Sequence, residues 1–234
     1  VDKDSVYKIE ESIEFWNIPH VAPGSAIILQ QYVENVMLIR SLENPTTFIA
    51  QETFSTGTAS ASVSVSSGFK IVSGGAWLDE NGPSILTSSY PNISGNSITS
   101  WTVEAQNCVS VPTANQVIKS FAIAIFDPFN LTTLTIDQST NSDKQSGLTQ
   151  IDQELTSGGI LVGGGVQTIN GGGQAKFIQD NIVNDPAHWL TAVHDYDFAA
   201  TNVTVTAFAI GLHFVNPLVL DVSAPVYPVV SVTG

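Results

Sequence analysis

One arrangement of residues occurs twice in this chain of 234 residues, and it restricts the folds that the chain can adopt. Each copy contains, in the same order, a Gly-Gly pair, an Asn-Gly dipeptide, a tryptophan and a closing apolar segment. The spacing between matching landmarks differs by only a few residues between residues 67–125 and residues 157–212, which predicts a duplicated supersecondary unit. The landmarks are Gly74-Gly75, Asn81-Gly82, Trp101 and residues 121–125 in the first copy, and Gly164-Gly165, Asn170-Gly171, Trp189 and residues 208–212 in the second.

Both copies consist of short apolar or alternating segments separated by turn residues, a pattern that is typical of β-strands. Because Asn and Gly both tolerate a positive φ, we expect Asn81-Gly82 to close a hairpin between residues 69–78 and residues 84–89. The same kind of hairpin is expected at Asn170-Gly171 in the second copy.

The closing segments of the two copies, residues 118–126 and 203–212, are almost continuously apolar. Strands with both faces covered have this composition, so we expect both segments to lie centrally in their sheets. Between the copies, residues 137–147 form the most polar stretch of the chain. We expect a long exposed loop there.

The Gly-Gly pairs have a structural interpretation. A Gly-Gly inside a strand is typical of a β-bulge, or of a place where a large ring lies close to the backbone. One tryptophan in each copy, Trp101 and Trp189, is available to supply that ring. A phosphate-binding loop is the alternative, but it needs glycines that open a helix, and the residues after Gly165 lack a helical pattern.

The two ends of the chain differ from the copies. Residues 1–45 hold most of the glutamates, and residues 216–234 contain prolines at a density that excludes a central strand. We therefore predict an all-β protein whose two tandem β-repeats, residues 46–127 and 128–215, pack as a sandwich or prism-like core with extended arms at both ends. Within the first arm, residues 26–42 fit either a helix or two buried strands, and we favour strands because the rest of the chain is so strongly β.

The low charge of the chain restricts its partners. Only 12% of the residues are charged, with 21 acidic against 7 basic residues and a formal net charge of -14. Such a chain repels phosphate-rich partners, so nucleic acid is excluded. No apolar run approaches the ~18 residues that a spanning helix needs, so membrane insertion is not expected. The first residue, Val1, fits a mature chain whose signal peptide has been removed, which predicts a secreted or cell-surface protein.

The sequence contains few candidates for chemistry. Its single cysteine, Cys108, rules out an internal disulfide framework and is expected to be buried. No Gly-x-Ser-x-Gly elbow marks a serine nucleophile, and we predict neither a catalytic residue nor a cofactor. His188 and His194 lie ~20 Å apart if the residues between them form one strand, so they cannot chelate one metal ion.

Two acidic stretches and a set of aromatic and amide side chains remain as candidate binding residues. Calcium binds clustered oxygen ligands, which the acidic stretches would supply in part, although neither has the EF-hand spacing. A carbohydrate ligand would contact aromatic faces and Asn side chains. The calcium candidates are Asp79, Glu80, Asp195 and Asp197, and the carbohydrate candidates are Trp77, Asn81, Tyr90 and Tyr196.

Three triplets match the N-glycosylation sequon, at Asn92, Asn130 and Asn202. Such triplets also arise by chance in a chain that is rich in Asn and Thr. They mark glycosylation sites only if the protein comes from a eukaryote or an archaeon.

Part of the first copy resembles a module of secreted bacterial β-proteins. The module reads Gly-Gly-Gly-Ala, Ser-Tyr-Pro and Trp-x-Val-x-Ala before a short apolar strand, and it is matched here by Gly74-Gly75-Ala76, residues 86–91 and residues 101–105. The second copy matches poorly, because Asp180-Asn181 stands where Tyr90-Pro91 would fall. The cysteines that are usual in the module are also missing. The resemblance implies a secreted β-fold, with no assigned activity to carry over.

Together these features predict a non-catalytic, secreted structural subunit. We expect its terminal arms to add strands to neighbouring copies and so to build an extracellular filament, surface layer or coat. The alternative is a carbohydrate-binding lectin or adhesin, which gains support if Trp77 is exposed beside the Asn81 turn and loses it if Trp77 is buried. A hydrolase would require two carboxylates that face one cleft ~5 to 10 Å apart.

Overall fold

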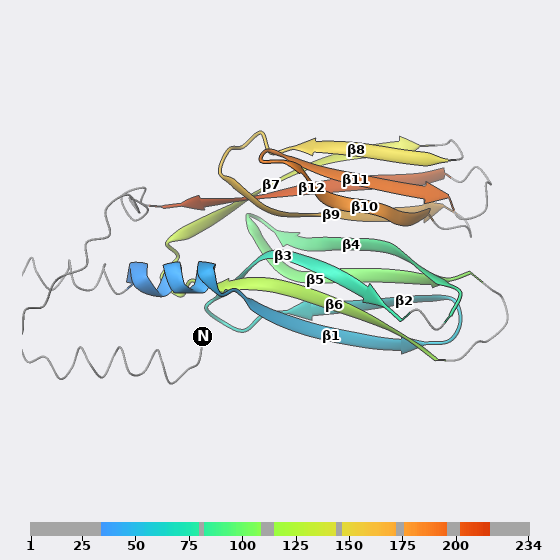
Figure 1. The fold of residues 1–234 in the computed structure, drawn as a ribbon, viewed down its shortest axis with the longest axis horizontal. Coiled ribbons are helices and arrows are strands. Elements are labelled where there is room, and N and C mark those ends of the chain that lie inside the picture. The colour runs from blue at the N-terminus through green and yellow to red at the C-terminus, as the bar shows by residue number, and fades with distance from the viewer. Residues whose placement is uncertain are drawn as a thin grey trace, which may run out of the picture.

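A computed structural model describes residues 34–79, 82–108, 115–143, 147–171, 176–195 and 202–215 (Figure 1). These residues form a helix, residues 34–43, and strands β1 to β12 in three antiparallel sheets, which confirms the predicted all-β class. The strands are β1 (Thr46–Phe54), β2 (Thr58–Ser64), β3 (Phe69–Leu78), β4 (Ser84–Ser94), β5 (Ser97–Asn107), β6 (Gln116–Phe126), β7 (Thr132–Asp143), β8 (Leu148–Glu154), β9 (Ile160–Gly171), β10 (Lys176–Asp185), β11 (His188–Asp195) and β12 (Asn202–Phe214).

The sheets form two sandwiches that share one sheet. Sheet A has the strand order β1-β6-β3, sheet B the order β2-β5-β4-β9-β12-β7 and sheet C the order β10-β11-β8. Sheet A packs on the β2-β5-β4 part of sheet B, and sheet C packs on the β9-β12-β7 part (Figure 1). The two parts of sheet B meet where β4 lies beside β9, through the pair of Ser89 and Val166.

The two halves of the chain have the same strand order. The first half contributes β1-β6-β3 and β2-β5-β4, and the second contributes β7-β12-β9 and β8-β11-β10, so each strand of the second half takes the place of the strand six positions earlier. A β-bulge also recurs, at Val72 in β3 and at Val162 in β9, in each case two residues before the first glycine of the pair. Positions in the two halves can therefore be matched residue by residue.

The first glycine of each pair lies against the tryptophan of its own half, as predicted. A Cβ added at Gly74 would lie 2.1 Å from the ring of Trp101, and a Cβ added at Gly164 would lie 2.3 Å from the ring of Trp189. A side chain at either glycine would have to displace a ring that packs between the two sheets. The first glycine of each pair therefore leaves room for the tryptophan ring inside its sandwich.

The two tryptophans also donate equivalent hydrogen bonds. The indole N–H of Trp101 donates to Ser89 Oγ at 3.0 Å, and that of Trp189 donates to Asn181 Oδ1 at 2.6 Å. In both halves the acceptor residue is paired with the residue that stands two positions after the tryptophan. Ser89 and Asn181 are therefore equivalent positions.

This equivalence corrects the alignment of the second copy. Because Ser89 matches Asn181, the residues equivalent to Tyr90-Pro91 are Ile182-Val183 and not Asp180-Asn181, as the sequence had suggested. The sequence alignment was wrong by two residues because the segment from the Gly-Gly pair to β10 is two residues longer than the segment to β4.

The Asn-Gly dipeptides do not close hairpins, contrary to expectation. β3 pairs with β6 and β4 pairs with β5, so the connection that contains Asn81-Gly82 crosses from sheet A to sheet B. β9 runs on to Gly171 in sheet B, while β10 belongs to sheet C. Two-residue hairpins instead join β4 to β5 at Gly95-Asn96 and β10 to β11 at Pro186-Ala187. A turn sequence specifies a change of direction, whereas packing across the sandwich decides which strands pair.

The polar stretch that was predicted to be a loop is largely strand. Residues 137–143 belong to β7, which pairs with β12 along its whole length and forms an edge of sheet B. An edge strand is partly solvated, so it accepts a run of polar side chains that a central strand would not.

The two closing strands, β6 and β12, are central in their sheets, as predicted. β12 is buried on both faces, and its Ile210 belongs to the same apolar cluster as Ile71 and Val72 of the first half. On β6, one face is buried in the core but the other carries half-buried side chains, including Phe121 and Ile123. The prediction that both faces are covered is therefore confirmed for β12 and wrong for β6 within the described part of the chain.

Residues 34–43 form a helix, so the preference for strands was wrong there, and residues 26–33 lie outside the described residues. Leu38 is buried and Leu42 packs against the same core, a spacing of four that places both on one helix face. The helix ends before Asn44-Pro45, since the residue before proline avoids the helical conformation. In the described ranges, no helix has the length and apolar character to cross a membrane.

Candidate functional site

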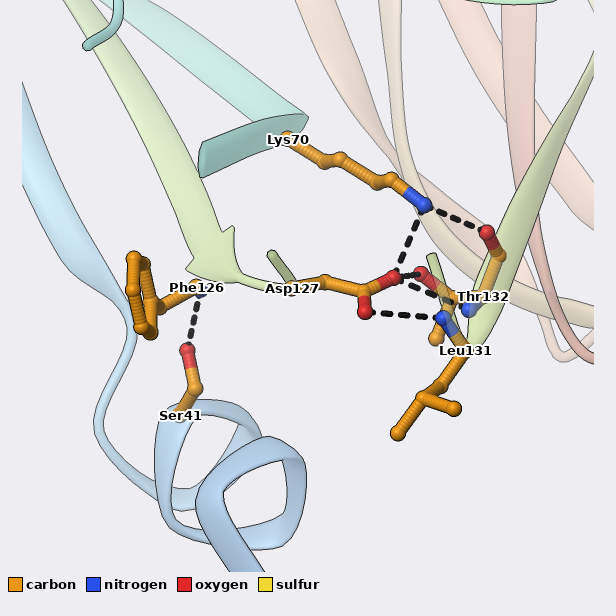
Figure 2. Close-up of polar contacts among 6 residues, drawn as sticks. All are labelled: Ser41, Lys70, Phe126, Asp127, Leu131 and Thr132. Carbon is orange, nitrogen blue, oxygen red and sulfur yellow. Dashed lines mark hydrogen bonds and ion pairs between the residues drawn. The ribbon is translucent and has the colours of Figure 1, made fainter. Parts of the chain in front are cut away.

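A buried carboxylate lies where the first half of the chain joins the second (Figure 2). Asp127 directly follows β6, and the turn after it passes through Asn130, whose φ of 57° lies in the left-handed region that Asn tolerates. The carboxylate accepts a hydrogen bond from Lys70 Nζ at 2.8 Å and further bonds from donors at the start of β7. These donors are Leu131 N at 2.8 Å, Thr132 N at 2.9 Å and Thr132 Oγ1 at 2.6 Å.

These hydrogen bonds decide the charge of Asp127. Burial raises the pKa of this carboxyl, but the hydrogen bonds from Lys70, Thr132 and Leu131 outweigh burial and hold the pKa below its ordinary value. Asp127 is therefore ionised at neutral pH and forms an ion pair with Lys70, whose ammonium also donates to Thr132 O at 2.6 Å. Both charged groups thus bind the segment that connects the two halves.

The helix is attached beside this cluster. The N–H of Phe126, the residue before Asp127, donates to Ser41 Oγ on the helix (Figure 2). One end of the molecule thus joins the helix, β3, β6 and β7 through a few polar contacts. We call Ser41, Lys70, Asp127, Leu131 and Thr132 the linker clamp.

A groove of about 310 Å³ lies beside the linker clamp. Of the residues that line it, only Lys70 is ionisable, and its ammonium already donates to Asp127 and to Thr132 O. The groove suits packing or a neutral ligand better than acid–base chemistry. Its walls are Phe69, Lys70, Ile71, Asn96, Ser97, Ile98, Asn130, Thr132, Thr133 and Leu134.

A second groove, about 380 Å³, lies on sheet B where β5 and β4 approach β9. Glu104 on its wall accepts a hydrogen bond from the Tyr90 hydroxyl at 3.5 Å. Burial raises the pKa of Tyr90, and the charge of Glu104 raises it further, so the phenol stays neutral at physiological pH. Beside this pair, Asn92 Nδ2 donates to Ser100 Oγ at 2.8 Å and to Thr102 Oγ1 at 2.6 Å. This face of sheet B is therefore polar and largely uncharged.

Trp77, a predicted carbohydrate contact, is 42% exposed on the outer face of sheet A. Lys119 Nζ lies 4.5 Å from the centre of its ring, a cation–π contact. Tyr90 lies in sheet B, on the other side of the same sandwich, so the structure does not bring Trp77 and Tyr90 together. Asn81 and Tyr196, the other two candidates, lie outside the described residues.

The two histidines that the sequence singled out lie at opposite ends of β11. His188 Nδ1 lies 2.8 Å from Asp185 Oδ2, and this hydrogen bond raises the pKa of His188. The pKa of Asp185 is lowered, first by the backbone N–H of Ala187 and then by His188. His194 packs against Phe177, with 5.7 Å between ring centres. No three His, Cys, Asp or Glu side chains gather as a metal site in the part of the chain that the structure describes.

The calcium prediction stays a prediction. Asp79 follows β3 and its N–H donates to Val117 O at 2.9 Å, while Asp195 ends β11. Glu80 and Asp197, which would complete the two acidic stretches, lie outside the described residues.

Cys108 is half-buried, which departs from the expectation of a buried residue. It directly follows β5, at the end of a strand and not inside the core. Its Sγ lies 3.8 Å from Gln106 O.

Sequence reasoning missed the linker clamp. Its charged members, Lys70 and Asp127, stand 57 residues apart, and nothing local marks them as partners. One signal was available: Asp127 is an acidic residue placed between an apolar strand and Pro128, and a carboxylate at such a place needs donors if it is buried. The partner itself could not be found without the pairing of β3 with β6.

No family model matches the chain, and no curated protein sequence matches it.

Proposed function

We propose that the protein is a non-catalytic structural subunit that self-assembles into an extracellular filament, surface layer or coat. In this proposal, the segments before residue 34 and after residue 215 add strands to the sheets of neighbouring copies. The polar, weakly charged surface of sheet B and the unprotected edges of the first half support it.

The observation that carries the proposal is the pair of free edges on the first half. Among the described residues, β1 pairs only with β6 and β2 pairs only with β5. Neither strand contains Pro or Lys, the residues with which natural proteins protect sheet edges, and Ile49 of β1 is 59% exposed. The β2 edge of seven residues is uncharged, and the β1 edge of nine residues carries Glu52 as its single charge, so both are templates for a further strand.

The terminal segment offers suitable strands by its sequence. Residues 218–222 and 229–232 are rich in β-branched residues, and prolines separate them from the rest of the chain. Prolines at these places confine such segments to a sheet edge, because proline cannot donate a hydrogen bond to a neighbouring strand.

Sedimentation velocity and electron microscopy of the full chain test the proposal. We expect particles that grow with protein concentration, and we expect the double variant Gln51→Lys, Thr53→Lys to stay small because charges on β1 oppose a further strand. A matched control, Thr56→Lys with Ser66→Lys, adds the same charge in turns and should assemble like the parent. A full chain that remains a single-sized monomer at high concentration contradicts the proposal, as does equal assembly of both variants.

A carbohydrate-binding role is the second candidate, and the exposure of Trp77 favours it. Sugar rings stack on exposed aromatic rings, and Trp77 is 42% exposed, with the amine of Lys119 over one face of its ring. A glycan array followed by titration of tryptophan fluorescence checks this role. We expect a binding glycan to lose affinity at least tenfold with Trp77→Ala, and an array without a hit rejects the role.

A further inference from the structure

The two halves of the chain have equivalent sheet faces with different surroundings. Phe208 on β12 and Phe121 on β6 match, because each is paired with the second glycine of its half, Gly165 or Gly75. Phe208 is only 4% exposed, whereas Phe121 is half-buried. The first half covers the β9-β12-β7 face, and no described residue covers the same face of sheet A in a comparable way.

The surroundings of Gly165 show how the first half covers the β9-β12-β7 face. A Cβ added at Gly165 would lie 2.7 Å from Ser89 O, 3.1 Å from Tyr90 Cα and 3.2 Å from Pro91 Cδ. Glycine is thus needed at position 165 because β4 of the first half crosses there with its backbone in contact.

Buried hydrogen bonds complete the same contact. The N–H of Thr168 donates to Ser88 Oγ at 3.0 Å, and the hydroxyl of Thr168 donates to Thr87 O at 2.9 Å. All three side chains are buried. The junction between the halves is therefore a closely packed contact between β4 and β9.

Among the described residues, nothing contacts the counterparts of this junction. A Cβ added at Gly75 would meet nothing within 4 Å, and Gly75 has no positive φ that would require glycine. On β10, Ile182 and Val183 take the positions of Tyr90 and Pro91, and they are 51% and 54% exposed. An open glycine and two exposed apolar residues thus occupy the positions that are in contact at the junction.

We infer that the outer face of sheet A binds the β10 edge of a second copy of this chain, with Ile182 and Val183 of one copy against Gly75 and Phe121 of the next. The interface repeats, between two copies, the glycine contact that joins the halves within one copy, without its side-chain hydrogen bonds, because Leu78 stands at the place of Thr168. It rests on the proposed self-assembly and adds a specific contact to it.

Charge and symmetry agree with this occupant. Lys119 lies on the face of sheet A, and Asp180 lies two residues before Ile182 on β10, so the two surfaces carry charges of opposite sign. The two surfaces belong to different halves, so the contact is head-to-tail and generates either a closed ring or an open filament. Carbohydrate binding by a monomer would not require this contact.

Cysteine cross-linking between two separately purified proteins tests the interface. In a Cys108→Ser background, one protein carries Gly75→Cys and the other carries Val183→Cys, and they are mixed with oxidised glutathione. We expect a disulfide-linked pair within minutes to hours. The control mixture replaces Val183→Cys by Ile160→Cys, an equally exposed apolar position outside the predicted contact, and should cross-link at least tenfold less.

A second variant, Gly75→Arg, distinguishes failure of this interface from failure of self-assembly. Because Gly75 borders open space, the variant should fold normally while the parent's large particles are lost. If particles form in sedimentation but neither the cross-link nor the effect of Gly75→Arg is seen, this interface is wrong and self-assembly stands. If the parent stays monomeric and no cross-link forms, both the interface and self-assembly are wrong.

Discussion

The two halves of this protein have the same strand order, but their cores differ in composition. The first half buries large apolar side chains between its sheets, among them Trp101, Ile71 and Ile118. The second half has a small cluster of valines around Val166, and the same space also holds polar side chains. The buried polar residues of sheet C, among those described, are Thr149, Gln153 and Thr191.

The difference shows that one strand order can be stabilised in two ways. The first half supplies most of the larger apolar cluster, to which Ile210 and Leu212 of β12 also belong, and leaves one face of β6 half-buried. The second half has a weaker core but buries both faces of β12, because the first half covers one of them. We therefore expect the second half to depend on the first for its stability, as regions with fewer buried apolar contacts open more readily.

Replacement of the two tryptophans should give the largest difference in stability loss between the halves. Trp101 is fully buried, and Trp101→Ala should lower the free energy of unfolding by about 3–5 kcal/mol. Trp189 is only half-buried, so Trp189→Ala should cost less than that. Urea denaturation of both variants measures this, and equal losses contradict the ranking of the two cores.

The linker clamp distinguishes the end of β6 from the end of β12, where Phe214 stands at the place of Asp127. Lys70→Met leaves the carboxylate of Asp127 buried without its cation. Because Lys70 is partly exposed, the expected loss is about 2–3 kcal/mol, below that of a fully buried pair. Thermal or urea unfolding of the variant checks the size of the loss.

The clamp also predicts a pH dependence. The pKa of Asp127 is lowered in the folded state, so its stabilising effect is complete above the unfolded pKa near 4 and is lost as the pH falls through the lower folded pKa. Asp127→Asn should be less stable than the parent at pH 7, and the gap should narrow below about pH 4. A gap that is unchanged from pH 7 to pH 3 contradicts the ion pair.

The second glycines form a matched pair across the halves. Gly165→Ala should lower stability by about 1–3 kcal/mol, because the new methyl group meets the backbone of β4. Gly75→Ala adds the same group in open space and should change the stability of the monomer by less than about 0.5 kcal/mol. Unfolding at a concentration where the protein is monomeric separates the two.

The two cores also differ in polarity at one pair of equivalent positions. Val103 and Thr191 are equivalent, since each stands two residues after its tryptophan, and the described contacts of Thr191 include no hydrogen bond to its buried hydroxyl. Thr191→Val should therefore stabilise the protein by up to about 1 kcal/mol. Val103→Thr should destabilise it by about 1–3 kcal/mol. Urea denaturation of both variants measures these changes in the free energy of unfolding.

Local patterns predicted part of this fold. The all-β class followed from alternation and turn residues, and the contact between glycine and tryptophan followed from two unusual residue types that recur at similar spacing. The helix at residues 34–43 was missed because four apolar residues in a row at positions 36–39 fit a buried strand as well as a helix. Only the contact of Leu38 and Leu42 with the core separates these two readings.

The candidate sites were less predictable than the fold. Trp77 was selected for its residue type, and its exposure depends on which face of β3 it occupies. The linker clamp joins residues from β3 and from the connection after β6, which are neighbours only because those strands pair. Side chains that meet through long-range pairing leave no local pattern, so no spacing rule could have found them.

By itself, the sequence determined the all-β class, most of the strand-forming segments and the residues that pack as ring and glycine, because each depends on the conformational preferences of a few neighbouring residues. The tertiary structure alone decided which strands pair, that Asn-Gly connections cross between sheets, and that equivalent faces are covered in one half and open in the other. The reason is physical: backbone preferences act over a few residues, whereas the burial of a sheet face depends on what the rest of the chain places over it.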